Sequence, residues 1–367
     1  MIKPTYRLLT GDVTECLRTL SDNSVHTCVT SPPYWFLRDY GTSKWEGGDP
    51  NCEHTVTGRP DQLRATKVNV PLDVNNIDNC YRCGAKRIDK QIGLEPNYKD
   101  YITNLTNVFH ELRRVLRKDG TLWLNLGDTY MSENKGSGGP SSLQDSNVGS
   151  RFTPRKVESD LKNKDLVGIP WSIVFSLRDD GWWLRSDIIW AKESYMPNSM
   201  DDRPTTAHEY IFLLSNDEKY YYDKWAIMEK GKSKEFGYRN KSTIWKVVSS
   251  NSKEEHYASF STELVKPCIL AGTSDYGVCS VCGNQYVREV EKTQLYFRTL
   301  GWKATCECNA EIVPATVIDI FSGTGTTGDC ALRNGRNYIG IDLSEKYNEI
   351  AERRLKAIAS QSMMSLI

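Results

Sequence analysis

Val25-His26-Thr27-Cys28-Val29-Thr30-Ser31-Pro32-Pro33-Tyr34-Trp35 joins a short, mainly apolar run to a pair of prolines. The run predicts a buried β-strand. Each proline lacks a backbone amide hydrogen, so the strand cannot continue its pairing through Pro32 and Pro33. Proline also holds the preceding residue extended, which fixes the directions of the Ser31 and Pro32 carbonyl groups. A rigid row of acceptors beside a tyrosine suits the binding of a planar amine.

A second junction of strand and loop lies near the C-terminal end of the sequence. The apolar run Thr316–Phe321 is followed by Gly323 and Gly325, and a helix is expected from Thr326. Asp342 ends the next predicted strand. Glycines let the backbone approach a cofactor closely, and an acidic strand end accepts hydrogen bonds from ribose hydroxyls. The loop is not Gly-x-Gly-x-x-Gly and lacks the lysine of a P-loop, which disfavours bound phosphates.

Together these two motifs resemble those of a known family. Ser31-Pro32-Pro33-Tyr34 is similar to the catalytic motif of the amino-methyltransferases of DNA, in the Ser form found in the cytosine-N4 subgroup. Asp319-x-Phe321-x-Gly323-x-Gly325-Thr326-Thr327 is similar to their S-adenosylmethionine loop. The proline motif comes first, which is the permuted order of the β group. The resemblance covers most of the chain apart from two cysteine-bearing insertions and the segment 130–160.

The resemblance implies the site residues. The cytosine amine would be held by the catalytic set Ser31, Pro32, Pro33 and Tyr34, after the base has flipped out of the double helix. Asp12 would bind the adenine amino group of the cofactor, Asp342 its ribose, and Thr326 and Thr327 would lie near its carboxylate. The implied cofactor-binding set is Asp12, Asp319, Phe321, Gly323, Gly325, Thr326, Thr327 and Asp342.

The predicted elements indicate an α/β fold. An amphipathic helix over Tyr98–Leu116, ended by Asp119-Gly120, precedes a buried strand over Thr121–Leu126, as in a crossover of a parallel sheet. The resemblance implies a Rossmann-like methyltransferase fold with a mixed, mostly parallel seven-stranded sheet. We expect a catalytic half (1–40 and 98–222), a zinc-binding insertion (41–97), a target-recognition region (223–257), a cofactor half (258–275 and 314–367) and a second zinc-binding insertion (276–313).

Eleven cysteines in a chain that we expect to be cytosolic indicate metal binding rather than disulfides. Two sets have the close pairs that tetrahedral zinc requires, and neither leaves a position for water, so two structural zinc ions are expected. Ligands could also be exchanged between the sets. Pro267-Cys268 resembles the nucleophile of cytosine-ring methylation, but Cys268 lies in an apolar helix, which argues against that role. The predicted ligands are Cys52, His54, Cys80 and Cys83 in the first set and Cys279, Cys282, Cys306 and Cys308 in the second.

The segment 224–253 carries eight basic and two acidic residues in a chain whose net charge is zero. These basic residues, with aromatic residues interleaved, favour phosphate and groove contacts with double-stranded DNA. The alternative is a solvated lysine-rich face, which has the same composition. The predicted DNA contacts are Arg239, Lys241, Trp245 and Lys246.

No apolar run approaches the length of a membrane span, and the N-terminus lacks the apolar core of a signal peptide. We therefore expect a cytoplasmic enzyme of bacterial, archaeal or phage origin, in the setting of restriction and modification. The recognition sequence, the oligomeric state and the existence of a cognate restriction endonuclease stay open.

Two alternatives compete with cytosine-N4 methylation of DNA. The first alternative is adenine-N6 methylation. Ser rather than Asp at the first position of the motif is only a preference of the cytosine-N4 subgroup, so it does not exclude adenine. A catalytically dead, zinc-bearing DNA-binding protein belongs to a different class, and the presence of both motifs argues against it. Protein-glutamine and RNA-base methyltransferases place the glycine loop first, unlike this chain.

Overall fold

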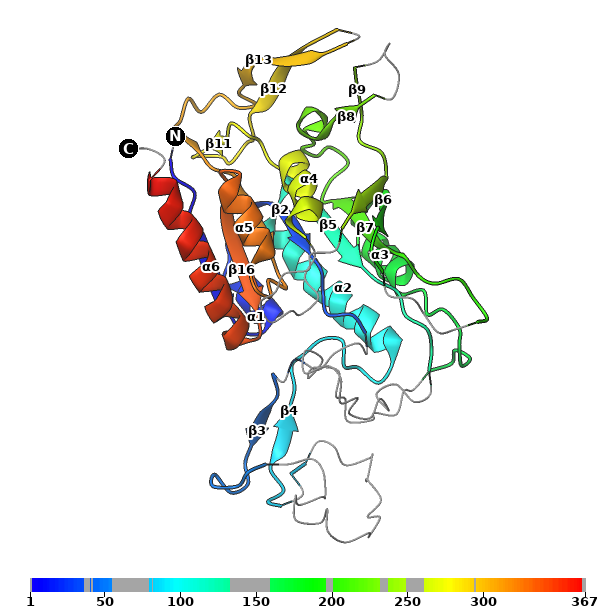
Figure 1. Ribbon diagram of the computed structural model, residues 1–367. Helices are drawn as coiled ribbons and strands as arrows, with labels where there is room; N and C mark the ends of the chain where they lie inside the picture. The colour runs from blue at the N-terminus through cyan, green and yellow to red at the C-terminus, as the bar shows by residue number, and fades with distance from the viewer. Residues whose placement is uncertain are drawn as a thin grey trace. The chain divides into compact units, whose positions relative to one another are not determined.

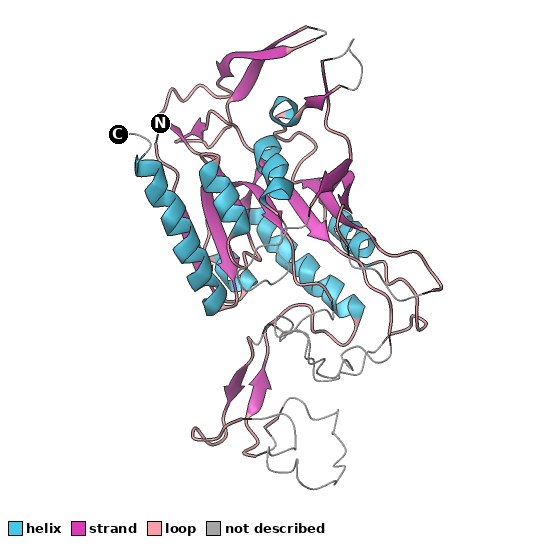
Figure 2. Ribbon diagram, in the orientation of Figure 1, coloured by secondary structure: helices cyan, strands magenta, loops and turns pink. Residues whose placement is uncertain are grey.

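The computed structural model describes residues 2–35, 40, 42–54, 79–80, 82–132, 159–195, 201–231, 237–248, 261–293 and 295–364 (Figures 1 and 2). The chain divides into two compact units. The first comprises Met1–Pro32, Ile102–Asp128 and Gly168–Ile367, and the second comprises Pro33–Tyr101 and Thr129–Val167. Residues 133–158 of the segment 130–160, and residues 41, 55–78 and 81 of the first insertion, lie outside the described residues.

One mixed sheet forms the centre of the first unit. Its strand order is β1-β16-β15-β2-β5-β7-β6-β10. The first five strands in this order are mutually parallel, β7 is antiparallel to both β5 and β6, and β10 is parallel to β6. The bounds are β1 Tyr6–Thr10, β2 Val25–Thr30, β5 Leu116–Leu126, β6 Trp183–Lys192, β7 His208–Ser215, β10 Ile244–Val247, β15 Thr316–Asp319 and β16 Asn337–Asp342.

The expected mostly parallel α/β fold is confirmed, with one strand more than the seven expected. The additional strand is β10, in which Ile244–Val247 pairs with Ile189–Lys192 of β6. Sequence periodicity could not show this strand, because it is short and lies in a polar, lysine-rich segment.

Six α-helices flank the described strands, and α4, α5 and α6 lie side by side (Figure 1). Helix α2 buries Leu105, Phe109 and Leu112 completely, as its amphipathic pattern predicts. It ends at Val115 rather than at Asp119-Gly120, because pairing with β2 already begins at Leu116. The bounds are α1 Val13–Arg18, α2 Tyr98–Val115, α3 Ile169–Asp179, α4 Thr262–Gly272, α5 Thr326–Arg333 and α6 Glu345–Met364.

Both insertions contain short antiparallel pairs, which suits polar segments with little core of their own. In the second unit, β3 (Lys44–Glu46) pairs with β4 (Lys86–Ile88). In the first unit, β11 (Val278–Cys279) pairs with β14 (Ile312–Val313), and β12 (Val287–Lys292) pairs with β13 (Phe297–Lys303). The short strands β8 (Glu229–Lys230) and β9 (Tyr238–Arg239) follow the 3₁₀ helix η3 (Lys224–Ile227).

Among the described helices, none combines the length and apolar character that crossing a bilayer requires.

Gly272, the last residue of α4, marks the closest approach of this helix to the sheet. A Cβ atom placed there would lie 2.6 Å from Thr27 Oγ1 and 2.7 Å from Thr121 Oγ1, two hydroxyls that are hydrogen-bonded to each other. We predict that Gly272→Ala lowers the free energy of unfolding by about 1–3 kcal/mol, since overpacking exceeds the gain in helix propensity.

Urea unfolding would measure this effect. The matched control is Lys266→Ala on the exposed side of the same helix, which should change stability by less than ~0.5 kcal/mol. An unfolding free energy for Gly272→Ala equal to or above that of the wild type would contradict the prediction.

Candidate active site and metal clusters

A single buried carboxylate joins three segments at the carboxyl edge of the sheet. Asp319, the last residue of β15, is 1% exposed. Its Oδ1 accepts hydrogen bonds from Thr30 Oγ1 (2.7 Å) and from the Phe321 amide (3.1 Å). Its Oδ2 accepts one from Thr327 Oγ1 (2.6 Å) in the first turn of α5. The end of the strand that carries the proline motif is therefore bonded directly to the strand that carries the glycine loop.

Ionisation of Asp319 is unfavourable in this buried position. Burial raises the pKa of Asp319 to about 6, although the three hydrogen bonds favour the ionised form and oppose the rise. The carboxylate thus positions Thr30, the Phe321 amide and Thr327, which are its described hydrogen-bond partners.

Asp342 and the glycine loop form the adjacent part of the edge. Asp342 ends β16, and its two oxygens accept hydrogen bonds from the Gly323 and Ser344 amides, both at 2.8 Å. Burial raises the pKa of Asp342. Gly323 has a φ of +50°, and a Cβ there would meet open space; Gly325 has a φ of +81°, and a Cβ there would lie 3.0 Å from Ala351. The loop is thus closely packed at Gly325 and open at Gly323.

Helix α5 begins directly after this loop, and no described side chain caps its N-terminus. Thr326 and Thr327 are buried, and their hydroxyls bond within the protein, to Arg354 (3.2 Å) and Asp319 respectively. What this helix end can offer an anionic group is its first backbone amides and the positive end of its dipole.

Asp12 lies at the end of the neighbouring strand β1. Its Oδ1 caps α1 by accepting a hydrogen bond from the Glu15 amide at 3.0 Å. The amide of Gly11 donates to the Asp342 carbonyl at 3.0 Å. Asp12, the next residue, therefore lies near the end of β16 at the same edge of the sheet. The structure thereby brings the ends of β1, β16, β15 and β2 into one row, as parallel strands require.

The proline motif leaves the sheet at the end of this row. Ser31 is half-buried and Pro32 is buried in the first unit, directly after Thr30. Pro33 and Tyr34 belong to the second unit. There the Pro33 carbonyl accepts a hydrogen bond from the Tyr101 hydroxyl at 2.7 Å, and the buried Trp35 donates to the Glu95 carbonyl at 2.8 Å. These bonds fix the course of the chain around the motif.

The cysteine sets assemble as two separate clusters, each in the grouping that the spacing predicts. In each cluster the four potential ligand atoms lie within 4.8 Å of one another, and no ligand is exchanged between the sets. Cys52 Sγ and Cys80 Sγ are 3.9 Å apart, and tetrahedral Zn–S bonds of about 2.3 Å place sulfurs about 3.8 Å apart. The donor atoms and their spacing therefore fit a tetrahedral metal ion. The members are Cys52, His54, Cys80 and Cys83 in one cluster and Cys279, Cys282, Cys306 and Cys308 in the other.

The second cluster is bonded to the central sheet, which the sequence did not reveal. Arg117 of β5 donates to the Cys282 carbonyl at 2.8 Å. His26 of β2 contacts the Gly283 carbonyl at 3.0 Å through Nε2, while its Nδ1 accepts from the Thr316 amide at 3.0 Å. The neutral imidazole with the proton on Nε2 satisfies both contacts. The insertion is thus anchored at the amino ends of β2, β5 and β15.

The predicted DNA contacts occupy different environments. Arg239 is exposed and ion-paired with Glu229 at 2.9 Å, and Lys246 is exposed. Trp245 is a correction: it is only 4% exposed, packs with Trp123 and donates to the Ser242 carbonyl, because β10 places it on the core side of the sheet. Lys241 covers this ring, with its Nζ 5.0 Å from the ring centroid.

Sequence reasoning missed Thr30 and Arg354. Thr30 ends an apolar strand and shows no pattern of its own, although its place beside the proline motif was a usable signal. Arg354 of α6 bonds Thr326 and Asp329 across helices, with Nε 2.8 Å from Asp329 Oδ2. An arginine on a helix carries no sequence signal that predicts this pairing.

Comparison with known proteins gives consistent matches over most of the chain. The N6/N4 methylase family model, described as DNA methylase, matches residues 25–353. The type II methyltransferase M.Cfr9I of Citrobacter freundii is 36% identical over 95% of this chain and 87% of its own length. The structure of PvuII DNA methyltransferase (cytosine-N4-specific) has a TM-score of 0.53 at 15% identity and covers 98% of this chain and 93% of its own. TTHA0409 from Thermus thermophilus, complexed with S-adenosyl-L-methionine, has a TM-score of 0.50 at 19% identity, covering 97% and 95%. These two likenesses support the fold.

The raised pKa of Asp319 predicts a specific pH dependence of stability. The native pKa of about 6 lies above the ordinary value of 3.8, so the native state retains the proton longer than the unfolded chain. The carboxyl therefore stabilises the native state fully below pH ~4, and this contribution is lost as the pH rises through 6. Asp319→Asn cannot ionise. We predict that the wild type loses on the order of 2–3 kcal/mol relative to this variant between pH 4 and 7.

Urea unfolding of both proteins at several pH values would measure the difference. A difference that stays constant over this range, or that changes in favour of the wild type, would contradict a raised native pKa of Asp319.

Proposed function

The chain belongs to the N6/N4 DNA methylase family, and from this premise we propose that it transfers a methyl group from S-adenosylmethionine to the exocyclic N4 of cytosine in double-stranded DNA. The observation that carries the proposal is the buried hydrogen bond between Thr30 and Asp319. It holds the last residue before the Ser-Pro-Pro-Tyr motif against the strand that ends in the glycine loop. An amine acceptor site and a cofactor loop thereby start from adjacent strand ends.

The choice of cytosine over adenine rests on Ser31. The motif resembles the cytosine-N4 subgroup in having serine as its first residue, and the PvuII enzyme named above is described as cytosine-N4-specific. Adenine-N6 methylation is the alternative, since both reactions methylate an exocyclic amine on a planar ring.

The residues at the carboxyl edge fit S-adenosylmethionine. Asp342 uses one lone pair on each oxygen for an amide and retains acceptor capacity for ribose hydroxyls. The open side of Gly323 and the uncapped start of α5 suit the close approach of a ligand and its carboxylate. When bound, S-adenosylmethionine supplies the activated methyl group.

The chain's own residues orient the target amine. The Ser31 hydroxyl and the Pro32 carbonyl accept its hydrogen bonds, which draws the nitrogen lone pair out of conjugation with the ring. Fixed carbonyl dipoles also stabilise the positive charge that develops on the nitrogen. Tyr34 stacks on the flipped base, and Asp12 accepts from the adenine amino group of the cofactor. Asp319 and Thr327 belong to the implied cofactor-binding set, and the hydrogen bond between them holds the glycine loop in place.

Digestion of DNA from cells expressing the protein, followed by nucleoside mass spectrometry, tests the proposed base. N4-methylcytosine is expected. N6-methyladenine would establish the alternative. Absence of both, together with a failure of purified protein to bind S-adenosylmethionine in calorimetry, would favour an inactive DNA-binding protein instead.

We predict that Ser31→Ala and Tyr34→Ala each lower the turnover number by about 10²–10³, the size expected when one preorganised transition-state contact is lost. Binding of S-adenosylmethionine should persist in both variants, because neither residue belongs to the cofactor set. The matched control, Tyr34→Phe, keeps the stacking ring and should retain most of the activity. Unchanged turnover in either alanine variant would contradict these roles.

We also propose that each cysteine cluster holds one structural zinc ion. Four soft ligands leave no position for water, so the ions stabilise the insertions rather than act in the reaction. The bonds from Arg117 and His26 carry the effect of the second ion to the central sheet.

Elemental analysis of purified protein should find two zinc ions per chain. Cys52→Ser and Cys308→Ser should each remove one, because each deprives a different cluster of a ligand. Cys16→Ser on α1 is the control and should retain both. A zinc content unaffected by Cys52→Ser and Cys308→Ser would rule out these clusters as the binding sites.

A further inference from the structure

The segment between the two cysteine pairs of the second cluster forms the hairpin β12–β13, and the metal ligands close its base. Its chain position lies outside the expected target-recognition region at 223–257. The structure nevertheless places this hairpin against η3 and β9, which belong to that region. Phe297 of β13 has its ring centroid 5.3 Å from that of Trp225 and 5.0 Å from that of Tyr238. One aromatic cluster thus spans both segments.

The backbones of the two segments also meet. A Cβ atom placed on Gly237 would lie 1.5 Å from the Leu295 carbonyl oxygen, in the turn of the hairpin. Only glycine at position 237 allows this approach. The hairpin is therefore seated on the recognition region at its turn as well as at its aromatic residues.

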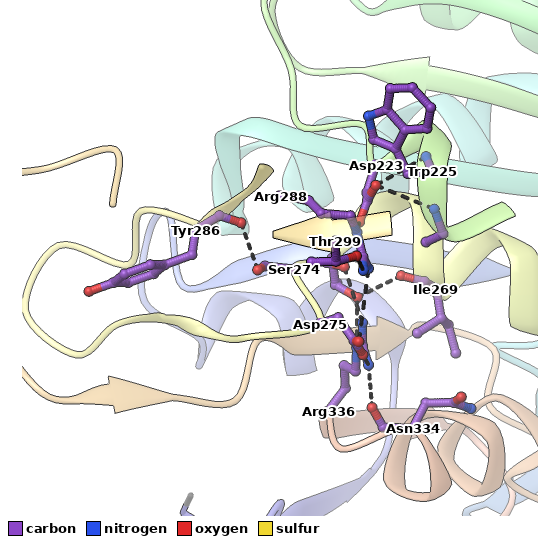
Figure 3. A network of polar contacts seen from close by, with 12 residues as sticks. Asp223, Trp225, Ile269, Ser274, Asp275, Tyr286, Arg288, Thr299, Asn334 and Arg336 are labelled. Atoms are coloured by element: carbon purple, nitrogen blue, oxygen red, sulfur yellow. Dashed lines mark hydrogen bonds and ion pairs between the residues drawn. The ribbon is translucent and has the colours of Figure 1, made fainter. Parts of the chain in front are cut away.

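A polar network fixes the base of the same assembly (Figure 3). Arg288 of β12 pairs with the 2%-exposed carboxylate of Asp223 at 2.9 Å, and the same carboxylate caps η3 through the Trp225 and Ala226 amides. Arg288 also bonds Thr299 at 2.9 Å and lies 4.3 Å above the Trp302 ring. This contact ties the hairpin to η3, and truncating one member of such a buried ion pair is costly.

The outer side of this assembly combines cations with exposed apolar groups. Lys224 and Lys292, from the two different segments, have their Nζ atoms 4.8 and 5.9 Å from the Trp225 ring centroid. Hairpin β12–β13 carries four basic side chains against two acidic ones, and one of the acidic ones, Glu291, is paired with Arg298 at 2.7 Å. Leu295 and Tyr296 at its turn and Leu300 in the middle of β13 are more than half exposed.

We propose that the hairpin β12–β13 is a DNA-contacting element, which with η3 and β8–β9 forms one recognition face for double-stranded DNA. The inference rests on the proposed function, which supplies DNA as the substrate. Lysines set beside aromatic rings bind phosphates while offering surfaces to bases and sugars, and exposed apolar tips are the groups that proteins insert at base steps. The second cysteine cluster then serves recognition by holding the base of the hairpin.

The test compares the exposed double variant Lys292→Ala/Tyr296→Ala with the wild type. Binding to a fluorescently labelled duplex is measured by anisotropy over a range of salt concentrations, and S-adenosylmethionine binding by calorimetry. We expect DNA affinity to fall at least tenfold and the slope of log K against log salt to fall by about 1, for one lost phosphate contact. Cofactor affinity should not change. The matched control is Arg353→Ala/Lys356→Ala on α6, which also removes exposed cations and should bind DNA as the wild type does.

The outcomes separate this inference from the proposed function. If the wild type neither binds nor methylates DNA, the proposed function fails, and the inference with it. If the wild type methylates DNA and the hairpin variant matches it in affinity and salt slope, the hairpin proposal alone is overturned. Loss of self-association in sedimentation, with DNA binding intact, would likewise overturn it by identifying the face as a contact between copies of the chain.

Discussion

The hydrogen bond from Thr30 to Asp319 is the constraint on which the candidate site depends. Two motifs almost 300 residues apart must present their reactive ends on the same side of the molecule. Parallel pairing of β2 with β15 brings the strands together, but it does not by itself fix the loops that follow them. The buried carboxylate does so, because it bonds the end of one strand, the first loop amide and the first turn of α5 at once. Its position in the core makes those bonds strong and makes ionisation costly.

The same principle appears at the opposite end of the sheet. The second cysteine cluster could have been an appendage, yet Arg117 and His26 bond its backbone to the amino ends of the central strands. Further along the insertion, Arg288 reaches the carboxylate of Asp223. Beyond this pair, Asp275 binds the fully buried Arg336, which also donates to Thr273 at 3.0 Å (Figure 3). The second insertion, the residue that caps η3 and the start of β16 are therefore linked through the side chains of Arg288 and Arg336.

The arginine links show that the second cysteine cluster does more than fold a polar segment locally, which is what its composition implied. Four-ligand clusters indicate local folding of polar segments, and both assemble as the spacing predicted. In the second cluster the segment between the ligand pairs is itself a structured hairpin with an exposed aromatic and basic face. The four clustered side chains thus lie at the base of a paired hairpin, whose strands extend away from them.

The sequence by itself determined the α/β class, the helices with clear periodicity such as α2 and α5, and the grouping of the cysteines. Local chemistry decides each of these: spacing of apolar residues, proline and glycine at strand ends, and ligand pairs one or two residues apart. It also indicated Asp342 and Gly323 as candidate site residues, because Asp342 ends a strand and Gly323 lies in the loop after one. Only the tertiary structure showed that Thr30 bonds to Asp319, that Trp245 is buried on an eighth strand, and that the hairpin in the second insertion packs against η3 and β9. Those facts depend on which segments meet in space, and a hydroxyl, a tryptophan or a glycine has the same local sequence pattern whichever partner it finds.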